Sequence, residues 1–111
     1  MRIISQNGAF DVPYEMSAIR NDDKLIILNM VGETGKGNII ARYSTSKKAE
    51  KAMEMLREQY SRLQVLKILA SGICEHMAKS LSEDEFLEYN LKYRKMNIFQ
   101  FPKDGDVELS E

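Results

Sequence analysis

Short apolar runs broken by polar turn residues occupy the first 43 residues, and this pattern predicts strands rather than helices. Asn7-Gly8 and Asn21-Asp22-Asp23 are strong turn signals, and Pro13 excludes the middle of a sheet. The β-prone segments that these residues separate are Arg2–Ser5, Ala9–Val12, Tyr14–Arg20, Leu25–Val31 and Asn38–Tyr43.

The loop "GETGKGN" after the apolar run 25–31 is similar in composition to a phosphate-binding loop, since it contains glycines, a lysine and a threonine. Gly32 and Gly37 have the Walker A separation, but Asn38 and Ile39 stand where lysine and serine or threonine are required. The residues that follow alternate with a strand period instead of opening a helix. We therefore predict a turn between two antiparallel strands and no nucleotide-binding loop of this type.

After Ser44-Thr45-Ser46, three candidate N-caps, the period changes to three and four residues, which predicts a long amphipathic helix. The pattern holds to Leu69 and weakens beyond it, where Gly72 is a candidate break. The apolar positions are Ala49, Ala52, Met53, Leu56, Tyr60, Leu63, Leu66, Leu69, Ile73 and Met77.

A second, shorter helix is expected from Ser82, where Glu85 completes a capping box, to about Arg94-Lys95. A last short strand follows at 97–102, and the acidic tail 103–111 is expected to be flexible, with Val107 and Leu109 as candidate anchors. The sequence thus predicts one α+β domain, 1–111: an N-terminal antiparallel sheet of about four to five strands, a long helix, a short helix and a final strand.

The length of the first helix bears on assembly. Unbroken from Ser46 to Lys79 it would extend about 50 Å, whereas a compact domain of this size is about 34 Å across. A helix that extends beyond the domain would need a partner to cover the apolar side chains of Leu66, Leu69 and Ile73. We therefore expect a homo-oligomer formed through the long helix, unless the helix kinks at Gly72.

Composition narrows the class of protein. The 111 residues are 43% hydrophobic and 30% charged with a net charge of −1, which is ordinary for a folded domain and gives no overall field for nucleic acid or an anionic membrane. The basic cluster Lys47, Lys48 and Lys51 is small, so nucleic-acid binding is disfavoured. The longest apolar run is too short to span a bilayer, and the single cysteine fits a reducing compartment. The expected location is the cytoplasm of the host cell.

The chain offers little catalytic chemistry. Cys74 and His76 lie two residues apart and so point to different sides of a helix, and a metal site lacks further ligands. The acidic residues after Ser82 suit a helix N-terminus without any acid–base role. We predict no enzyme, no metal and no cofactor.

Arginine and tyrosine provide the best candidate binding site. Guanidinium groups suit phosphates and aromatic rings suit bases, and several such residues are expected where the sheet meets the first helix. The alternative is that they are surface arginines beside core tyrosines, which is the commoner arrangement. The candidate residues are Arg20, Arg42, Tyr43, Arg57 and Tyr60.

Three segments, "MRIISQNGAFDVPYE", "YSTSKKAEKAMEMLREQY" and "FQFP", together resemble a family of small, largely uncharacterised proteins of Firmicutes phages and prophages. The resemblance covers essentially the whole chain and carries no catalytic residues. It implies a phage accessory protein. The expected layout of sheet, helices and oligomer is also similar to Thoeris anti-defence proteins, which sequester nucleotide-type messengers.

Two hypotheses of function follow from the resemblance. In the first, the protein counteracts host immunity as a sponge for a nucleotide-derived signalling molecule. In the second, it is a protein-binding inhibitor or adaptor, similar to an anti-CRISPR protein, that acts on a host defence or regulatory protein. Both need a preformed binding surface and no reaction.

Overall fold

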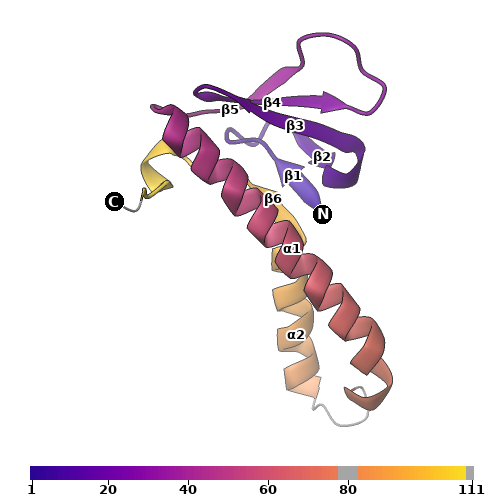
Figure 1. Cartoon of the computed structure of the whole chain (residues 1–111). Coiled ribbons are helices and arrows are strands. Elements are labelled where there is room, and N and C mark those ends of the chain that lie inside the picture. Colours follow the sequence, from indigo (N-terminus) through magenta and orange to yellow (C-terminus); the bar gives the residue numbers. More distant parts are fainter. Residues whose placement is uncertain (78–82, 110–111) are drawn as a thin grey trace.

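The computed structural model of the chain describes residues 1–77 and 83–109, and its order of elements confirms the predicted α+β class (Figure 1). Five strands precede a long helix, a shorter helix and a final strand. The elements are β1 (Arg2–Ile4), β2 (Asp11–Pro13), the 3-10 turn η1 (Tyr14–Met16), β3 (Ser17–Asp22), β4 (Leu25–Met30), β5 (Asn38–Arg42), α1 (Ser46–Met77), α2 (Glu83–Met96), β6 (Ile98–Gln100) and the 3-10 turn η2 (Asp104–Asp106).

The strands form two three-stranded sheets and not the single antiparallel sheet that the sequence predicted. One sheet has the order β2-β1-β6 and the other the order β3-β4-β5. The final strand β6 runs parallel to β1, with Ile3 opposite Phe99. A parallel pair needs a long crossover connection, and the helices α1 and α2 lie between β5 and β6 in the chain.

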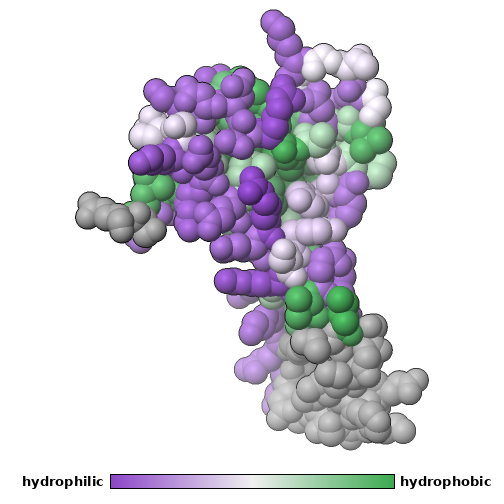
Figure 2. Space-filling view, viewed as in Figure 1, coloured by the Kyte–Doolittle hydropathy of each residue, from purple (hydrophilic) through white to green (hydrophobic). Residues whose placement is uncertain are grey.

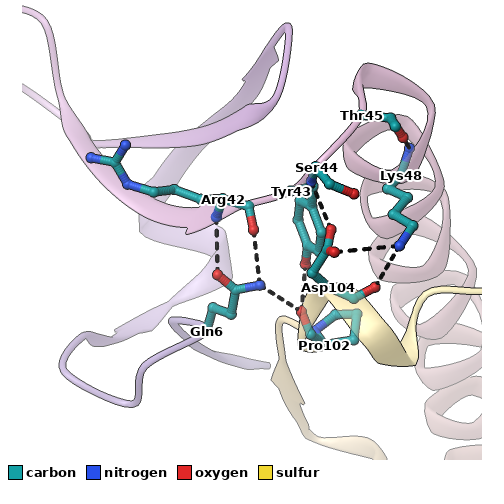
Figure 3. Close-up of polar contacts among 8 residues, drawn as sticks. All are labelled: Gln6, Arg42, Tyr43, Ser44, Thr45, Lys48, Pro102 and Asp104. Atoms are coloured by element: carbon teal, nitrogen blue, oxygen red, sulfur yellow. Dashed lines mark hydrogen bonds and ion pairs between the residues drawn. The ribbon is translucent and has the colours of Figure 1, made fainter.

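Gln6 joins the two sheets. Its backbone N–H donates to the carbonyl of Ile40 at 2.8 Å. Its side-chain amide accepts from the Arg42 N–H at 3.0 Å and donates to the carbonyls of Arg42 and Pro102, each at 3.1 Å (Figure 3). The end of β1, the end of β5 and the segment after β6 therefore meet at one side chain.

The first helix begins where its sequence predicts, and it covers the strands with its apolar face. Thr45 Oγ1 accepts from the Lys48 N–H at 3.2 Å, which is an N-cap bond. The N-terminal half of α1 lies across the strands in Figure 1. Both sheets and this helix share one core, formed by Met1, Ile3, Ile26, Leu28, Ile40, Ala41, Tyr43, Ala49, Ala52, Met53, Leu56, Leu63, Phe99, Phe101 and Val107.

The C-terminal half of α1 extends beyond the strands together with α2 and forms a helical arm (Figure 1). The helix continues through Gly72 to Met77, so the glycine does not end it. The arm makes the molecule elongated: its extents are 49 × 38 × 21 Å and its radius of gyration is 16.6 Å, against about 13 Å for a compact chain of this length. Ser82, the expected cap of α2, lies outside the described residues.

The segment after Pro102 is held against the core as far as Val107, although the sequence indicated a flexible tail from residue 103. Val107 is 4% exposed, while Leu109, the second candidate anchor, is exposed. Asp104 Oδ1 accepts from the Ser44 N–H at 2.7 Å, and the Lys48 ammonium donates to the Asp104 carbonyl at 3.0 Å (Figure 3). Buried apolar surface and charge-assisted bonds together outweigh the polar composition of this segment.

We expect Asp104→Asn to reduce the stability of the protein at neutral pH but much less at acidic pH. The Ser44 N–H, followed by the Lys48 ammonium, holds the pKa of the Asp104 carboxyl below its usual range. A carboxyl with a lowered folded-state pKa stabilises the fold above its unfolded pKa, and that contribution is lost as the pH falls through the folded pKa. Melting temperatures between pH 7 and pH 2.5 should therefore converge for the two proteins as the pH falls.

Asp106→Asn is the matched control, because the Asp106 carboxylate makes no hydrogen bond or ion pair with the described residues. Its melting temperature should follow that of the unchanged protein at every pH. A constant offset of Asp104→Asn from pH 7 to pH 2.5 would contradict the ionic role of Asp104.

Candidate functional site

A groove lies between strand β3 and helix α1. Its cavity volume is about 600 Å³, which is within the range of about 300–1,000 Å³ typical of ligand sites. Apolar side chains of β3 and α1 and polar side chains of η1, β3 and α1 line it together. The lining residues are Tyr14, Glu15, Ser17, Ile19, Arg20, Asn21, Met53, Leu56 and Arg57.

The β3 wall of the groove is a sheet edge. β3 pairs with β4 on one side only and is the first strand of its sheet. The Met16 carbonyl accepts from the Val31 N–H, so the backbone groups of Met16 face β4. Successive residues of an antiparallel strand point their backbone groups to alternate sides, and those of Ile19 and Asn21 therefore point away from β4. No hydrogen bond to another described segment satisfies those groups. An unpaired edge of this kind is a template for a further strand.

The two arginines of the groove differ in what their guanidinium groups do. Arg20 donates to Asn29 Oδ1 at 2.9 Å and to the Lys36 carbonyl at 3.0 Å, so it fastens the loop between β4 and β5. Arg57 is exposed, and no ion pair among the described residues includes it. Arg57 is therefore the cation that the groove offers to a ligand.

Aromatic and acidic groups occupy the end of the groove near η1. The rings of Tyr14 and Tyr60 pack with their centroids 4.5 Å apart at 47°. Glu15 accepts from the Met1 amino group at 2.8 Å, and this ammonium holds the pKa of the Glu15 carboxyl below its usual range. Tyr60, a residue expected from the sequence, thus reaches the groove through its contact with Tyr14.

Arg42 and Tyr43, the other two expected residues, do not line the groove. Arg42 lies on β5, the strand at the opposite edge of the sheet from β3, and its guanidinium points away from α1 in Figure 3. Tyr43 is 5% exposed, and its hydroxyl donates to the Pro102 carbonyl at 2.8 Å. Burial, and secondarily Asp104, raises the pKa of that hydroxyl. Tyr43 therefore joins the connection between β5 and α1 to the C-terminal segment structurally.

The sequence alone does not indicate several of the residues that line the groove. Ser17, Ile19 and Asn21 alternate toward α1 and are half-buried, which is a strand pattern, but the sequence predicts only a β-prone segment at 14–20 that ends before Asn21. Met53 and Leu56 carry the signal of any core-facing helix position. Their spacing along the helix is the same whether they line a groove or pack in the core, so the sequence cannot distinguish the two.

The described residues show no group of three or more histidine, cysteine, aspartate or glutamate side chains that could hold a metal ion. The side chains of Cys74 and His76 lie outside the described residues. Among the helices as far as they are described, none is long and apolar enough to cross a membrane. What the groove offers is an apolar floor, one available cation and unpaired backbone groups.

Comparison with known protein families, with curated proteins and with solved structures gave no match to this chain.

Proposed function

We propose that the protein is a non-catalytic binding protein that captures an extended segment of another protein in the groove between β3 and α1. The observation that carries this proposal is the free edge of β3 beside a groove of about 600 Å³. An extended peptide gains backbone hydrogen bonds from such an edge, and alternate side chains enter the pocket next to it.

The lining of the groove defines the peptide chemistry. Ile19, with Met53 and Leu56 buried behind it, gives the groove an apolar wall for one inward side chain. Arg57 provides a cation for an acidic side chain two residues away, since inward positions of a strand recur every second residue. The expected ligand is therefore an extended segment with the pattern apolar–any–acidic. From the resemblance to phage proteins, we expect this segment to belong to a host defence or regulatory protein.

Selection of random dodecapeptides displayed on phage against the immobilised protein tests the proposal directly. We expect the apolar–any–acidic pattern to be enriched. Binding of a selected peptide should fall at least tenfold in Arg57→Ala, while Arg62→Ala, another exposed arginine of α1 outside the groove, should bind as the unchanged protein does.

The strand-addition geometry has its own test. Asn21→Pro removes an N–H that points away from β4, so it should leave the β3–β4 ladder intact and block the added strand. N-methylation of alternate peptide amides tests the same contact without altering the protein. Equal binding by the N-methylated and unmodified peptides would exclude strand addition.

A nucleotide-derived messenger is the second candidate ligand, because Arg57 and the Tyr14–Tyr60 pair are the guanidinium and aromatic groups that such a ligand needs. In this sponge function the ligand is held and later released intact. Thermal-shift measurements with cyclic di- and trinucleotides and ADP-ribose distinguish the candidates. A shift that Arg57→Ala abolishes and Asn21→Pro retains would favour the messenger over the peptide.

A further inference from the structure

The exposed side of α2 carries a seam of four residues, Asp84, Leu87, Leu91 and Arg94. The steps between them are three, four and three residues, which is the spacing of the contact positions of a coiled coil. Leu87 is 59% exposed and Leu91 is 55% exposed, and Asp84 and Arg94 are also exposed. The seam therefore has two apolar residues at its centre and one charge of each sign at its ends.

The arm also carries exposed apolar side chains outside the seam. Among the arm residues whose side chains are described, the exposed large apolar ones are Val65 and Ile68 of α1 and the two leucines of the α2 seam. Figure 2 shows apolar surface on the arm beside the grey atoms, below a body that is mainly polar. Such surface usually marks an interaction site.

The order of residues along the seam indicates which partner would bind to it. Leu87 and Leu91 lie two residues before and after position 89, and Asp84 and Arg94 lie five residues before and after it. A two-fold axis at this position places each leucine against the other leucine of a second copy, and each Asp84 against Arg94. In a parallel pairing, like charges would meet instead. The seam is thus complementary to itself only in the antiparallel direction.

We propose that α2 pairs with α2 of a second copy of this chain as an antiparallel two-helix contact centred between Leu87 and Leu91. The charges at the ends of the seam are available for this contact, because neither makes an ion pair with the described residues. The sequence predicts the long helix as the oligomer surface, through Leu66, Leu69 and Ile73. Leu66 is half-buried, and the side chains of Leu69 and Ile73 lie outside the described residues, whereas the self-complementary seam lies on α2.

The contact is small, so its strength is limited. Four leucines, two from each copy, cover much less than the roughly 1,200 Å² of a stable interface. We therefore expect a reversible dimer with a dissociation constant between about 10 µM and about 1 mM. High salt should weaken the dimer, since its terminal ion pairs are exposed.

Sedimentation velocity of the full chain over that concentration range tests the proposal. Arg94→Asp places like charges at both ends of the contact, and it should shift association to at least tenfold higher concentration. The exchange Asp84→Arg with Arg94→Asp restores opposite charges in the antiparallel pair, and it should restore the dimer. Lys92→Asp, an exposed lysine of α2 outside the seam, controls for added negative charge.

Apolar variants separate the two sides of the arm. Leu91→Ala should weaken the dimer, while Val65→Ala, which truncates an equally exposed residue of α1, should not. Circular dichroism of each variant confirms that the helices are retained. A monomer throughout the concentration range, a dimer unaffected by Arg94→Asp, or no rescue by the exchange would each overturn the proposal. None of these outcomes bears on peptide binding in the groove.

Discussion

Replacing Phe101 by alanine should destabilise the protein by about 3–5 kcal/mol, the usual range for truncating a buried phenylalanine. Phe101 is 1% exposed and is among the largest fully buried side chains. Its ring packs edge-on against Phe99 with centroids 5.2 Å apart, and its N–H donates to the Ile4 carbonyl. The following residue, Pro102, accepts hydrogen bonds from Gln6 and Tyr43, so the cavity would form where several segments meet.

Equilibrium unfolding in urea measures this loss as a lower transition midpoint at an unchanged slope. Phe10→Ala is the matched control, because Phe10 is 37% exposed and its truncation should cost about 1 kcal/mol or less. Similar losses for the two phenylalanines would show that Phe101 does not occupy the centre of the core. A changed slope would indicate an altered denatured state instead of a simple cavity.

Replacing Gly37 by alanine should cost about 2–5 kcal/mol, because two penalties add. Gly37 has a φ of +81°, which disfavours a residue with a Cβ by about 1–2 kcal/mol. The added Cβ would also lie 2.6 Å from Asn29 Oδ1 and 2.8 Å from the backbone carbonyl oxygen of Leu28. Overpacking of this kind costs about 1–3 kcal/mol, and a displaced Asn29 would also lose its bond from Arg20.

Gly32→Ala separates the two penalties. Gly32 has a similar φ of +89°, but a Cβ there would have no neighbour within 4 Å. Urea unfolding should therefore show only the backbone cost for Gly32→Ala and a clearly larger loss for Gly37→Ala. Equal losses would mean that the close approach to Asn29 relaxes without cost.

Local features of the fold could be predicted because they depend on neighbouring residues. The hairpin of β4 and β5 follows from a β-prone run, glycines with positive φ and an alternating second strand. The start of α1 follows from Thr45 and the three-to-four-residue period behind it. The partner of β6 could not be predicted, since a short strand such as "IFQ" carries no signal for a strand 96 residues earlier in the chain.

The candidate site was predicted only in part, for a related reason. Arg20, Arg42 and Arg57 are equal candidates in the sequence, but the strand order places Arg42 at the far edge of the sheet from the groove. Arg20 lies in the groove, yet its guanidinium is bonded to the β4–β5 loop, a contact that depends on strand register. Only the folded arrangement shows that Arg57 is the available cation.

The parallel pairing of β1 with β6 also determines when the native core can be completed. Its register joins Ile3 to Phe99, so almost the whole chain lies between the two paired residues. Closing so long a loop slows folding, because the entropy is lost before the contact is made. During synthesis, β1 has no parallel neighbour until β6 has left the ribosome. The nascent chain therefore holds β1, which has only β2 as a neighbour, with one open edge throughout the translation of both helices. That interval is when the chain is most exposed to aggregation and to chaperones.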